Sequence, residues 1–357
     1  MTWRTAERKD ASPPRAAEPT LGDKVGFLRR PESYPFTVRE VTARETHMSW
    51  VFLAGDRVYK LKKPVRFSYL DFSTLARREA ACRAELRLNR RLAADVYLDV
   101  VPITLSPSGM AIGGAGDVVD WVVTMRRLAE DNTLEAAILA GRVTRQDADR
   151  VAEALIAFYR RVRRIAVAPR RRHAAWQKSA AENRRLLLDP RLGMPPGPVH
   201  AIDRVERRFL AEQGRLLAGR SRRIVDAHGD LRPEHIWLDE PIAIIDCLEF
   251  NPSLRALDPL DELAFLDLEC ERLGAHAVGE RIRRRVTDAL GDVAPAPLFL
   301  FYRCHRAMLR ARLAIVHLLE PEPRTPEKWP RLARAYLDLA AADAVRLERQ
   351  LRRRGGR

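Results

Sequence analysis

The sequence predicts an α+β protein with two lobes, a small antiparallel β-rich lobe followed by a larger, mainly helical lobe. Three observations support this prediction. Strand-like patterns are concentrated between residues 36 and 125, helical periodicity dominates after residue 133, and a short apolar strand within the helical part ends in an aspartate, Asp246. A chain of 357 residues, 46% of them hydrophobic, can bury a substantial core.

The β-rich lobe is expected to span residues 21–125, after a charged, proline-containing leader at residues 1–20 that is predicted to be disordered. Three short apolar runs around the turn Gly55-Asp56 predict an antiparallel meander, and one helix is expected at about residues 74–93. Two further strands flank a glycine-rich hairpin. The predicted strands are Val38–Ala43, Trp50–Ala54, Val58–Leu61, Val96–Leu105 and Val118–Met125.

Residues 126–132 are expected to form a hinge, residues 133–352 the helical lobe, and residues 353–357 a basic tail. The segment Thr144–Asp147 resembles a capping box and opens a strongly amphipathic helix. Another helix should begin at the cap Asp258, with proline in its first turn. Further helices are predicted near residues 174–188, 200–218, 276–290, 296–319 and 330–352.

The formal charge of +16 comes almost entirely from arginine, because only seven of the 64 basic residues are lysines. Such an excess indicates either a nucleic-acid or phosphate-bearing partner or an arginine-biased composition. The arginines are spread over many helical stretches with few interleaved aromatic residues, which favours the second explanation. Nucleic acid is therefore the less favoured partner.

The four cysteines are far apart and form no CxxC pair, so the sequence predicts neither a zinc site nor a disulfide framework. Reduced thiols fit the cytoplasm, which is the expected location. The amino terminus lacks the apolar core of a signal peptide. No apolar run approaches the ~20 residues of a membrane helix, and we expect no membrane partner.

The densest group of chemically useful side chains lies in a hairpin predicted at residues 226–251. It contains the turn His228-Gly229-Asp230 and, sixteen positions after Asp230, Asp246 at the end of an apolar strand. Enzymes that transfer a phosphoryl group from ATP need one carboxylate to accept the proton of the attacking hydroxyl and another to hold magnesium on the phosphates. Asp230 is the candidate general base and Asp246 the candidate magnesium ligand; the alternative for each is a structural cap. His228 is expected to brace the turn.

Such an enzyme also needs a lysine on the phosphates and a glutamate that orients the lysine. Lysine is scarce in this chain, yet three of the seven fall within residues 60–63. Alternation places Lys60 and Lys62 on one face of the predicted strand. We assign the phosphate contact to Lys60, with Lys62 as the alternative. The orienting role falls to Glu85 on the following helix, with Glu79 as the alternative.

Five segments are informative in combination: Thr46–Leu53, Tyr59–Pro64, Leu70–Ser73, Glu85–Leu92 and His228–His235. Together they resemble a bacterial aminoglycoside-phosphotransferase-like family, which has the protein-kinase-like fold. Members of this branch are often fused to a carboxy-terminal P-loop ATPase that resembles gluconate kinase. The likeness extends over about residues 30–320.

The resemblance implies a protein-kinase-like fold with ATP and Mg²⁺ bound between the two lobes. It implies that backbone groups of the linker from Met125 to Leu128 hydrogen-bond the adenine. It also implies transfer of the γ-phosphate to a hydroxyl of a small-molecule acceptor held over the helical lobe. The acceptor does not follow from the fold, because one fold supports many substrates.

Two departures from the family pattern concern loops that bind phosphate. The chain contains no G-x-x-x-x-G-K-[ST] motif, so the fused ATPase is expected to be absent and a separate P-loop ATPase becomes a candidate partner. The loop between the first two strands contains no glycine, which leaves Ser49 or Thr46 to contact the nucleotide phosphates.

A third departure concerns the metal. His235 occupies the position at which related kinases carry an asparagine metal ligand. Imidazole suits softer metals better than Mg²⁺, so His235 either binds a metal such as Mn²⁺, forms hydrogen bonds instead, or marks weakened catalysis. Glu249 and Asn251 are candidate replacement ligands.

The segment from residue 246 to residue 271 reverses the charge of the chain, with eight acidic side chains and one basic side chain, Arg255. Either it lines a pocket for a cationic acceptor, or it contains one acidic helix whose charge matches the helix dipole. We favour the helix.

The sequence therefore favours an ATP-dependent small-molecule kinase that uses Mg²⁺. The first alternative is a nucleotide-binding regulator with little turnover, a degenerate kinase, which His235 and the missing glycine loop motivate. The second is an arginine-rich nucleic-acid-binding protein.

Overall fold

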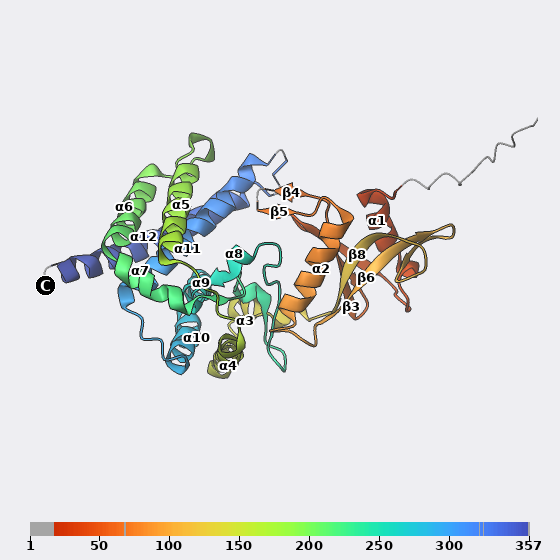
Figure 1. Cartoon of the computed structure of the whole chain (residues 1–357), viewed down its shortest axis with the longest axis horizontal. Helices are drawn as coiled ribbons and strands as arrows, with labels where there is room; N and C mark the ends of the chain where they lie inside the picture. Colours follow the sequence, from red (N-terminus) through yellow and green to blue (C-terminus); the bar gives the residue numbers. More distant parts are fainter. Residues whose placement is uncertain (1–17, 68, 321, 324, 356–357) are drawn as a thin grey trace, which may run out of the picture. The chain divides into compact units, whose positions relative to one another are not determined.

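The computed structural model describes residues 18–67, 69–320, 322–323 and 325–355, and Figure 1 labels its elements. The chain divides into two compact units. The first, called the sheet unit here, comprises the described residues up to Cys82 together with Asp99–Met125. The second, the helical unit, comprises Arg83–Leu98 and the described residues from Arg126 onward.

The start of the described chain is helical. Residues 1–17 of the predicted leader lie outside the described residues, whereas Thr20 caps α1 (Leu21–Leu28) through a capping box with Asp23. The sequence analysis did not predict this helix, because eight residues hold barely two turns of the helical period.

Within the described residues, six strands of the sheet unit form one sheet in the order β1-β2-β3-β8-β6-β7. The first three strands pair antiparallel, which confirms the predicted meander, and Gly55 turns the chain between β2 and β3 with φ +58°. A positive φ of this kind favours glycine. The strands are β1 (Val41–Glu45), β2 (Ser49–Ala54), β3 (Arg57–Lys62), β6 (Tyr97–Ser106), β7 (Gly109–Ile112) and β8 (Asp117–Arg126).

A buried carboxylate ties two helices to the sheet. Asp120 of β8 accepts hydrogen bonds from Lys24 of α1 at 2.9 Å and from Arg78 of α2 (Leu75–Asn89) at 2.8 Å. Phe27 and Leu28 of α1 join the apolar core of the unit. Because Asp120 has two cationic partners, its burial does not leave an uncompensated charge.

The helical unit consists mainly of α-helices, as predicted. Thr144 forms the expected capping box with Asp147, and Asp258 caps the helix that begins at Pro259. The described helices of this unit are α3 (Leu134–Leu139), α4 (Arg145–Arg161), α5 (Pro169–Leu187), α6 (Pro196–Glu212), α7 (Gly214–Arg220), α8 (Pro252–Arg255), α9 (Pro259–Arg272), α10 (His276–Ala289), α11 (Ala296–Ile315) and α12 (Lys328–Gly355). No helix among the described residues has both the length and the apolarity needed to cross a bilayer.

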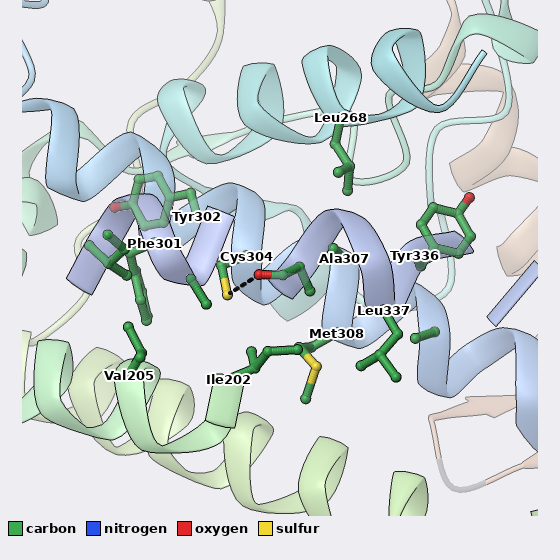
Figure 2. Close-up of a cluster of buried hydrophobic side chains, with 14 of the residues drawn as sticks. Ile202, Val205, Leu268, Phe301, Tyr302, Cys304, Ala307, Met308, Tyr336 and Leu337 are labelled. Atoms are coloured by element: carbon green, nitrogen blue, oxygen red, sulfur yellow. Dashed lines mark hydrogen bonds between the residues drawn. The ribbon is translucent and has the colours of Figure 1, made fainter. Parts of the chain in front are cut away.

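Helix α11 runs through the largest apolar core of the helical unit, where it packs against α6, α9 and α12 (Figure 2). Phe301 of α11 stacks on Phe209 of α6 with ring centroids 4.3 Å apart, and Ala307 and Met308 are fully buried. Burial of a Phe or Met side chain contributes about 1.5–3 kcal/mol. The packing fixes α9 and α11 side by side, and both carry polar side chains that reach the hairpin described next.

Candidate active site

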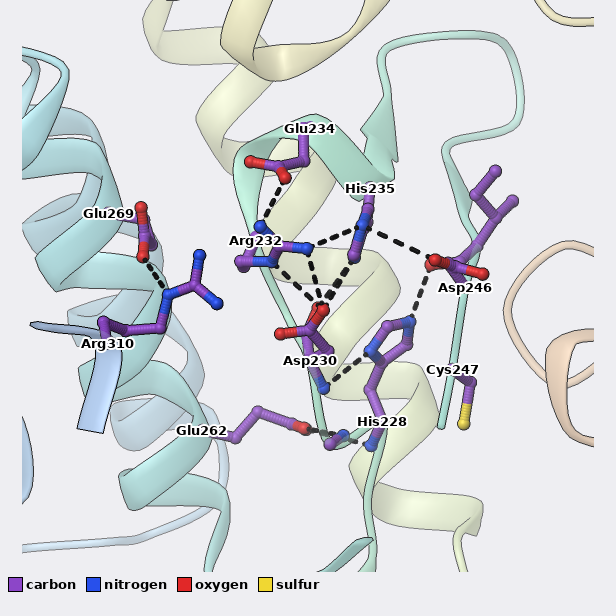
Figure 3. A network of polar contacts seen from close by, with 12 residues as sticks. His228, Asp230, Arg232, Glu234, His235, Asp246, Cys247, Glu262, Glu269 and Arg310 are labelled. Atoms are coloured by element: carbon purple, nitrogen blue, oxygen red, sulfur yellow. Dashed lines mark hydrogen bonds and ion pairs between the residues drawn. The ribbon is translucent and has the colours of Figure 1, made fainter. Parts of the chain in front are cut away.

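A two-stranded hairpin holds most of the residues to which the sequence analysis assigned chemistry (Figure 3). Strands β10 (Ile236–Trp237) and β11 (Ala243–Ile244) pair antiparallel, and the amide of Ile245 donates to the carbonyl of His235 at 3.0 Å. This register places His235 at the start of one strand beside Asp246 at the end of the other.

The turn that carries Asp230 is anchored by a buried glutamate of α9. Glu262 accepts hydrogen bonds from the amides of Gly229 at 2.6 Å and His228 at 3.3 Å, and from the hydroxyl of Tyr159 at 2.7 Å. Gly229 has φ +94°, and a side chain there would meet Leu248 at 3.0 Å. Both facts require glycine.

His228 is fully buried and links the turn to the strand. Its Nε2 donates to the carbonyl of Ile245 at 2.9 Å, and its Nδ1 accepts from the amide of Asp230 at 3.3 Å. Burial lowers the pKa of His228 to about 4, so the ring is neutral at pH 7. These contacts give His228 the bracing position that the sequence analysis expected.

The carboxylate of Asp230 lies at the edge of this network, with 22% of its side chain exposed. Oδ2 accepts from Nε and Nη2 of Arg232, at 3.1 and 2.9 Å. Burial alone would raise the pKa of Asp230, but the positive charges of Arg232 and then Arg310 outweigh it and leave the pKa below its ordinary value. Asp230 is therefore ionised at neutral pH, as a proton acceptor must be.

His235 connects Asp230 to Asp246. Its Nδ1 donates to the carbonyl of Asp230 at 2.9 Å, and its Nε2 accepts from Arg232 at 3.2 Å, since a guanidinium can only donate. Nε2 also lies 3.8 Å from Oδ2 of Asp246. His235 thus forms the hydrogen bonds that were one of its three expected roles.

Asp246 is more accessible than Asp230, with 47% of its side chain exposed. Its backbone has φ +65°, and its amide donates to the hydroxyl of Tyr97 at 3.3 Å. A left-handed conformation in a residue other than glycine costs free energy and is often found at functional sites. An accessible carboxylate fits Mg²⁺, which binds proteins through one or two carboxylates and keeps its remaining sites for phosphates and water.

The two candidate replacement ligands differ in their engagement. Asn251 caps α8, where its Oδ1 accepts from the amide of Ser253 at 3.0 Å and from its hydroxyl at 2.7 Å. Glu249 is half-buried in the segment after Asp246. The cap engages the side-chain oxygen of Asn251, and Glu249 stays the predicted second oxygen ligand.

Within the sheet unit, Ser49 and Lys62 lie directly opposite each other on β2 and β3, and both are buried. The hydroxyl of Thr46 accepts from the amide of Ser49 at 3.0 Å and donates to its carbonyl at 2.9 Å, so it closes the short loop. Lys60 is half-buried, whereas Lys62 is only 1% exposed and its ammonium lies 4.9 Å from the ring centroid of Phe72. The two candidate lysines thus differ in burial, and the phosphate contact assigned to Lys60, with Lys62 as the alternative, stays a prediction.

Each of the remaining predicted residues lies within either the sheet unit or the helical unit. Glu85, in the part of α2 that belongs to the helical unit, is completely buried, whereas Glu79 is half-buried. Met125 lies near the end of β8 in the sheet unit, and Leu128 follows in the helical unit; both side chains are buried. The structure thus brings Asp230, His235 and Asp246 together in the helical unit, while Ser49 and the two lysines belong to the sheet unit.

The acidic segment proves to be largely structural. In α9, Asp261 pairs with Arg306 at 2.8 Å, Glu269 pairs with Arg272 at 2.7 Å, and Asp267 pairs with Arg303. Asp258 before the helix binds Arg220 through two contacts of 2.6 Å. Most of the acids thus lie in or before one helix, as favoured above, but arginines neutralise these buried carboxylates where the helix dipole was expected to match them.

Two residues that position Asp230 and its turn were not predicted from the sequence. Arg232 orients Asp230, and its position two residues after the base was a signal available in the sequence. Glu262 anchors the turn from 33 positions away, and no local pattern marks it out from the other acids of its helix.

Comparison with known proteins agrees with this architecture. No known family model matches the sequence. The chain is 35% identical over 318 residues to an uncharacterized protein of Mycobacterium tuberculosis (strain ATCC 25618 / H37Rv) and, at the same level, to one of Mycobacterium bovis (strain ATCC BAA-935 / AF2122/97). The match covers 86% of this chain and 58% of each relative, so the chain spans little more than half the length of these relatives.

Two solved structures are similar over most of their length. A thermostable mutant of the aminoglycoside phosphotransferase APH(4)-Ia, in a ternary complex with AMP-PNP and hygromycin B, is 15% identical with a TM-score of 0.51, covering 89% of this chain and 97% of that chain. An ethanolamine kinase of Plasmodium vivax is 10% identical with a TM-score of 0.50, covering 84% and 81%. The chain therefore has the protein-kinase-like fold, and the resemblance stated above is confirmed at the level of the fold.

Proposed function

We propose that the chain is an ATP-dependent phosphotransferase that moves the γ-phosphate of ATP to a hydroxyl of a small molecule. One observation carries this proposal. A single hairpin holds an ionised, partly exposed carboxylate, Asp230, and connects it through His235 to a more exposed carboxylate, Asp246. Phosphoryl transfer needs one carboxylate for the proton of the nucleophile and another for the metal, and this arrangement supplies both.

Each residue then has a definite task. Asp230 accepts the proton of the acceptor hydroxyl at Oδ1 or Oδ2 as the oxygen attacks the γ-phosphorus. Arg232 holds that carboxylate in place and adds positive charge beside it. Asp246 would hold Mg²⁺, with Glu249 as a second candidate ligand. When bound, the metal neutralises charge on the nucleotide phosphates.

For the nucleotide itself, we assign the phosphate contact to a lysine of β3, Lys60, with Lys62 as the alternative. Ser49, the first residue of β2 and opposite Lys62, is the other proposed phosphate contact. Glu85 keeps the orienting role, and Met125 to Leu128 the contacts to adenine. A cytoplasmic location and a separate P-loop ATPase as partner are parts of the same proposal.

The test is nucleotide turnover by the full chain. ADP formation from ATP is measured with a panel of sugars, amino alcohols, nucleosides and hydroxy acids, in Mg²⁺ and in Mn²⁺. We expect acceptor-dependent ADP formation that is lost in Asp230→Asn and kept in Asp288→Asn, the same chemical change on the exposed side of α10. Failure to bind ATP in either metal would contradict the proposal.

A nucleotide-binding regulator with little turnover is the second candidate, favoured by the contacts of His235. Both of its ring nitrogens are engaged, by the carbonyl of Asp230 and by Arg232, so it is less available to a metal than an asparagine would be. ATP binding without turnover in either metal, unchanged by Asp230→Asn, would decide for the regulator.

A further inference from the structure

Two arginines one turn apart on α11 are fixed in the same way beside the candidate base. Nε of Arg306 donates to Oδ1 of Asp261 at 2.8 Å, and Nε of Arg310 donates to the hydroxyl of Tyr336 at 3.4 Å. Nε of Arg310 also lies 3.5 Å from Oε1 of Glu269 on α9. In each case the protein holds the Nε atom, which we call the inner edge of the guanidinium. The two Nη atoms form its outer edge.

Aromatic rings fix the planes of the two groups. The guanidinium carbons of Arg306 and Arg310 lie 5.4 and 5.7 Å from the ring centroid of Phe265, and that of Arg310 lies 5.5 Å from the ring of Tyr336. Such stacking adds a favourable cation–π contact and removes conformational freedom. A guanidinium that is already fixed loses little entropy when it binds a ligand.

The outer edges of these groups are open. Among the described residues, none accepts a hydrogen bond from the Nη atoms of Arg306 or Arg310, and 10% and 20% of the two side chains are exposed. Figure 3 shows the outer edge of Arg310 turned towards Asp230, on the side away from Asp246. The charge of each arginine also interacts with the carboxylate of Asp230.

The carboxylates that hold the two arginines contact Nε and leave the Nη donors to a ligand. Asp261 and Glu269 are each committed to arginine at the inner edge, and Glu269 is shared with Arg272 at 2.7 Å. Oxyanions such as carboxylate and phosphate match the paired donors of a guanidinium. A cationic ammonium group offers no acceptor for these donors.

We infer that the acceptor carries an anionic group, a carboxylate or a phosphate, which the Nη atoms of Arg310 and Arg306 bind next to the hydroxyl that Asp230 deprotonates. This inference rests on the proposed function and names its substrate class. It replaces the cationic acceptor considered from the sequence, because five of the eight acids that suggested it are held in ion pairs with arginine. The specificity then comes from charge, since a site built for an oxyanion leaves its donors unpaired when the acceptor is neutral.

The experiment compares three small probes that share a hydroxyl and differ in charge: glycerol 3-phosphate, glycerol and ethanolamine. Their binding to the full chain is measured by calorimetry with AMP-PNP and Mg²⁺ at saturation, so that sites for nucleotide phosphates are filled. We expect glycerol 3-phosphate to bind at least about tenfold more tightly than the other two, as loss of a charge-assisted hydrogen bond implies. Equal or weaker binding of the anion would overturn the inference.

Substitutions then locate the site. Arg310→Gln should weaken glycerol 3-phosphate binding about tenfold or more, whereas Arg284→Gln, the same change on exposed α10, should leave it unchanged. Arg310→Lys and Arg306→Lys keep the charge and serve if the glutamine variant does not fold; both should weaken binding by losing the paired donors. Anion binding that is unaffected by all three would contradict the inference.

The phosphotransferase assignment and the anionic acceptor can be refuted independently of each other. If AMP-PNP does not bind, the phosphotransferase assignment fails, and titration of glycerol 3-phosphate without nucleotide still reports on the arginine pair. If ATP is turned over but the acceptor that supports turnover is cationic or neutral, with a KM unchanged by Arg310→Lys, the anionic acceptor fails while the phosphotransferase stands.

Discussion

The helical unit contains two groups of carboxylates that look alike in the sequence and differ in the structure. Asp230 and Asp246 in the hairpin keep 22% and 47% of their side chains exposed. Asp258, Asp261 and Asp267 in and before α9 are at most 1% exposed, and each is paired with arginine. Both groups are acids near apolar segments, yet only the first can meet a substrate.

The difference shows what separates a reactive carboxylate from a structural one. A carboxylate that moves a proton must be ionised, reachable and held in place, and Asp230 meets these conditions through Arg232 and the braced turn. A buried carboxylate must be fully compensated, because an unpaired buried charge costs several kcal/mol. Substitutions in the two groups should therefore separate activity from stability.

The largest effect is expected for Asp230→Asn. Asparagine keeps the shape of the side chain but accepts a proton poorly, so the rate of ADP formation should fall by about 10²–10⁴. The free energy of unfolding should change by less than about 1 kcal/mol, because the ion pair with Arg232 is partly exposed. Initial rates and urea unfolding of the same preparation check both values. A large loss of stability with no change in rate would make Asp230 structural.

The opposite behaviour is expected for Asp258→Asn. Asp258 accepts two hydrogen bonds from Arg220 and one from Tyr302, all in the interior, and removal of its charge leaves Arg220 with Asp292 alone. We expect a loss of about 3–5 kcal/mol in the free energy of unfolding. Urea unfolding measures it, with Asp288→Asn as the exposed control, expected within about 0.5 kcal/mol of the wild type. Equal stability of the two variants would refute the structural role.

His228 should make stability depend on pH. Its pKa is about 4 in the folded protein and 6.5 as the ordinary value, so between these values the unfolded chain binds a proton that the folded chain excludes. Stability should fall as the pH drops from about 6.5 towards 4, by up to about 3 kcal/mol at about 1.4 kcal/mol per pH unit. Urea unfolding of the wild type and of His228→Gln over this range isolates the contribution. Parallel pH profiles would contradict it.

A smaller effect is expected for Glu262→Gln. The amide nitrogen of glutamine cannot accept a hydrogen bond, so at least one of the amides of His228 and Gly229 or the hydroxyl of Tyr159 loses its acceptor. The loss should be about 1–3 kcal/mol in the free energy of unfolding, with a lower rate because the turn beneath Asp230 loosens. Glu153→Gln on the exposed face of α4 is the matched control. A rate equal to that of the control would show that the anchor does not matter for catalysis.

Local patterns predicted much of this molecule. The capping box at Thr144, the cap at Asp258 and the meander around Gly55 follow from side chains within a few positions of one another, and all three are present. The short helices α1 and α3 were missed, because six to eight residues show too little of the helical period.

The partners of the buried charged side chains could not be predicted from the sequence. Arg220 lies 38 positions from Asp258, Arg303 lies 40 from Asp343, and Glu262 lies 33 from Gly229. Such pairs are set by how the helices pack, which no local pattern encodes. The same pairs explain part of the arginine excess, since these arginines serve the interior rather than a polyanionic partner. For the proposed phosphate contact, strand alternation placed Lys60 and Lys62 on one face, and the structure shows that the two differ in burial.

The most direct test of the account is the binding of AMP-PNP, measured by calorimetry with and without Mg²⁺, in the wild type and in Asp246→Ala. If Asp246 holds the metal on the nucleotide, Mg²⁺ should strengthen binding to the wild type and have no such effect on Asp246→Ala, while Asp230→Asn keeps the full metal dependence. The same Mg²⁺ dependence in wild type and Asp246→Ala would show that the hairpin does not carry the metal, and the proposed phosphotransferase site would be wrong.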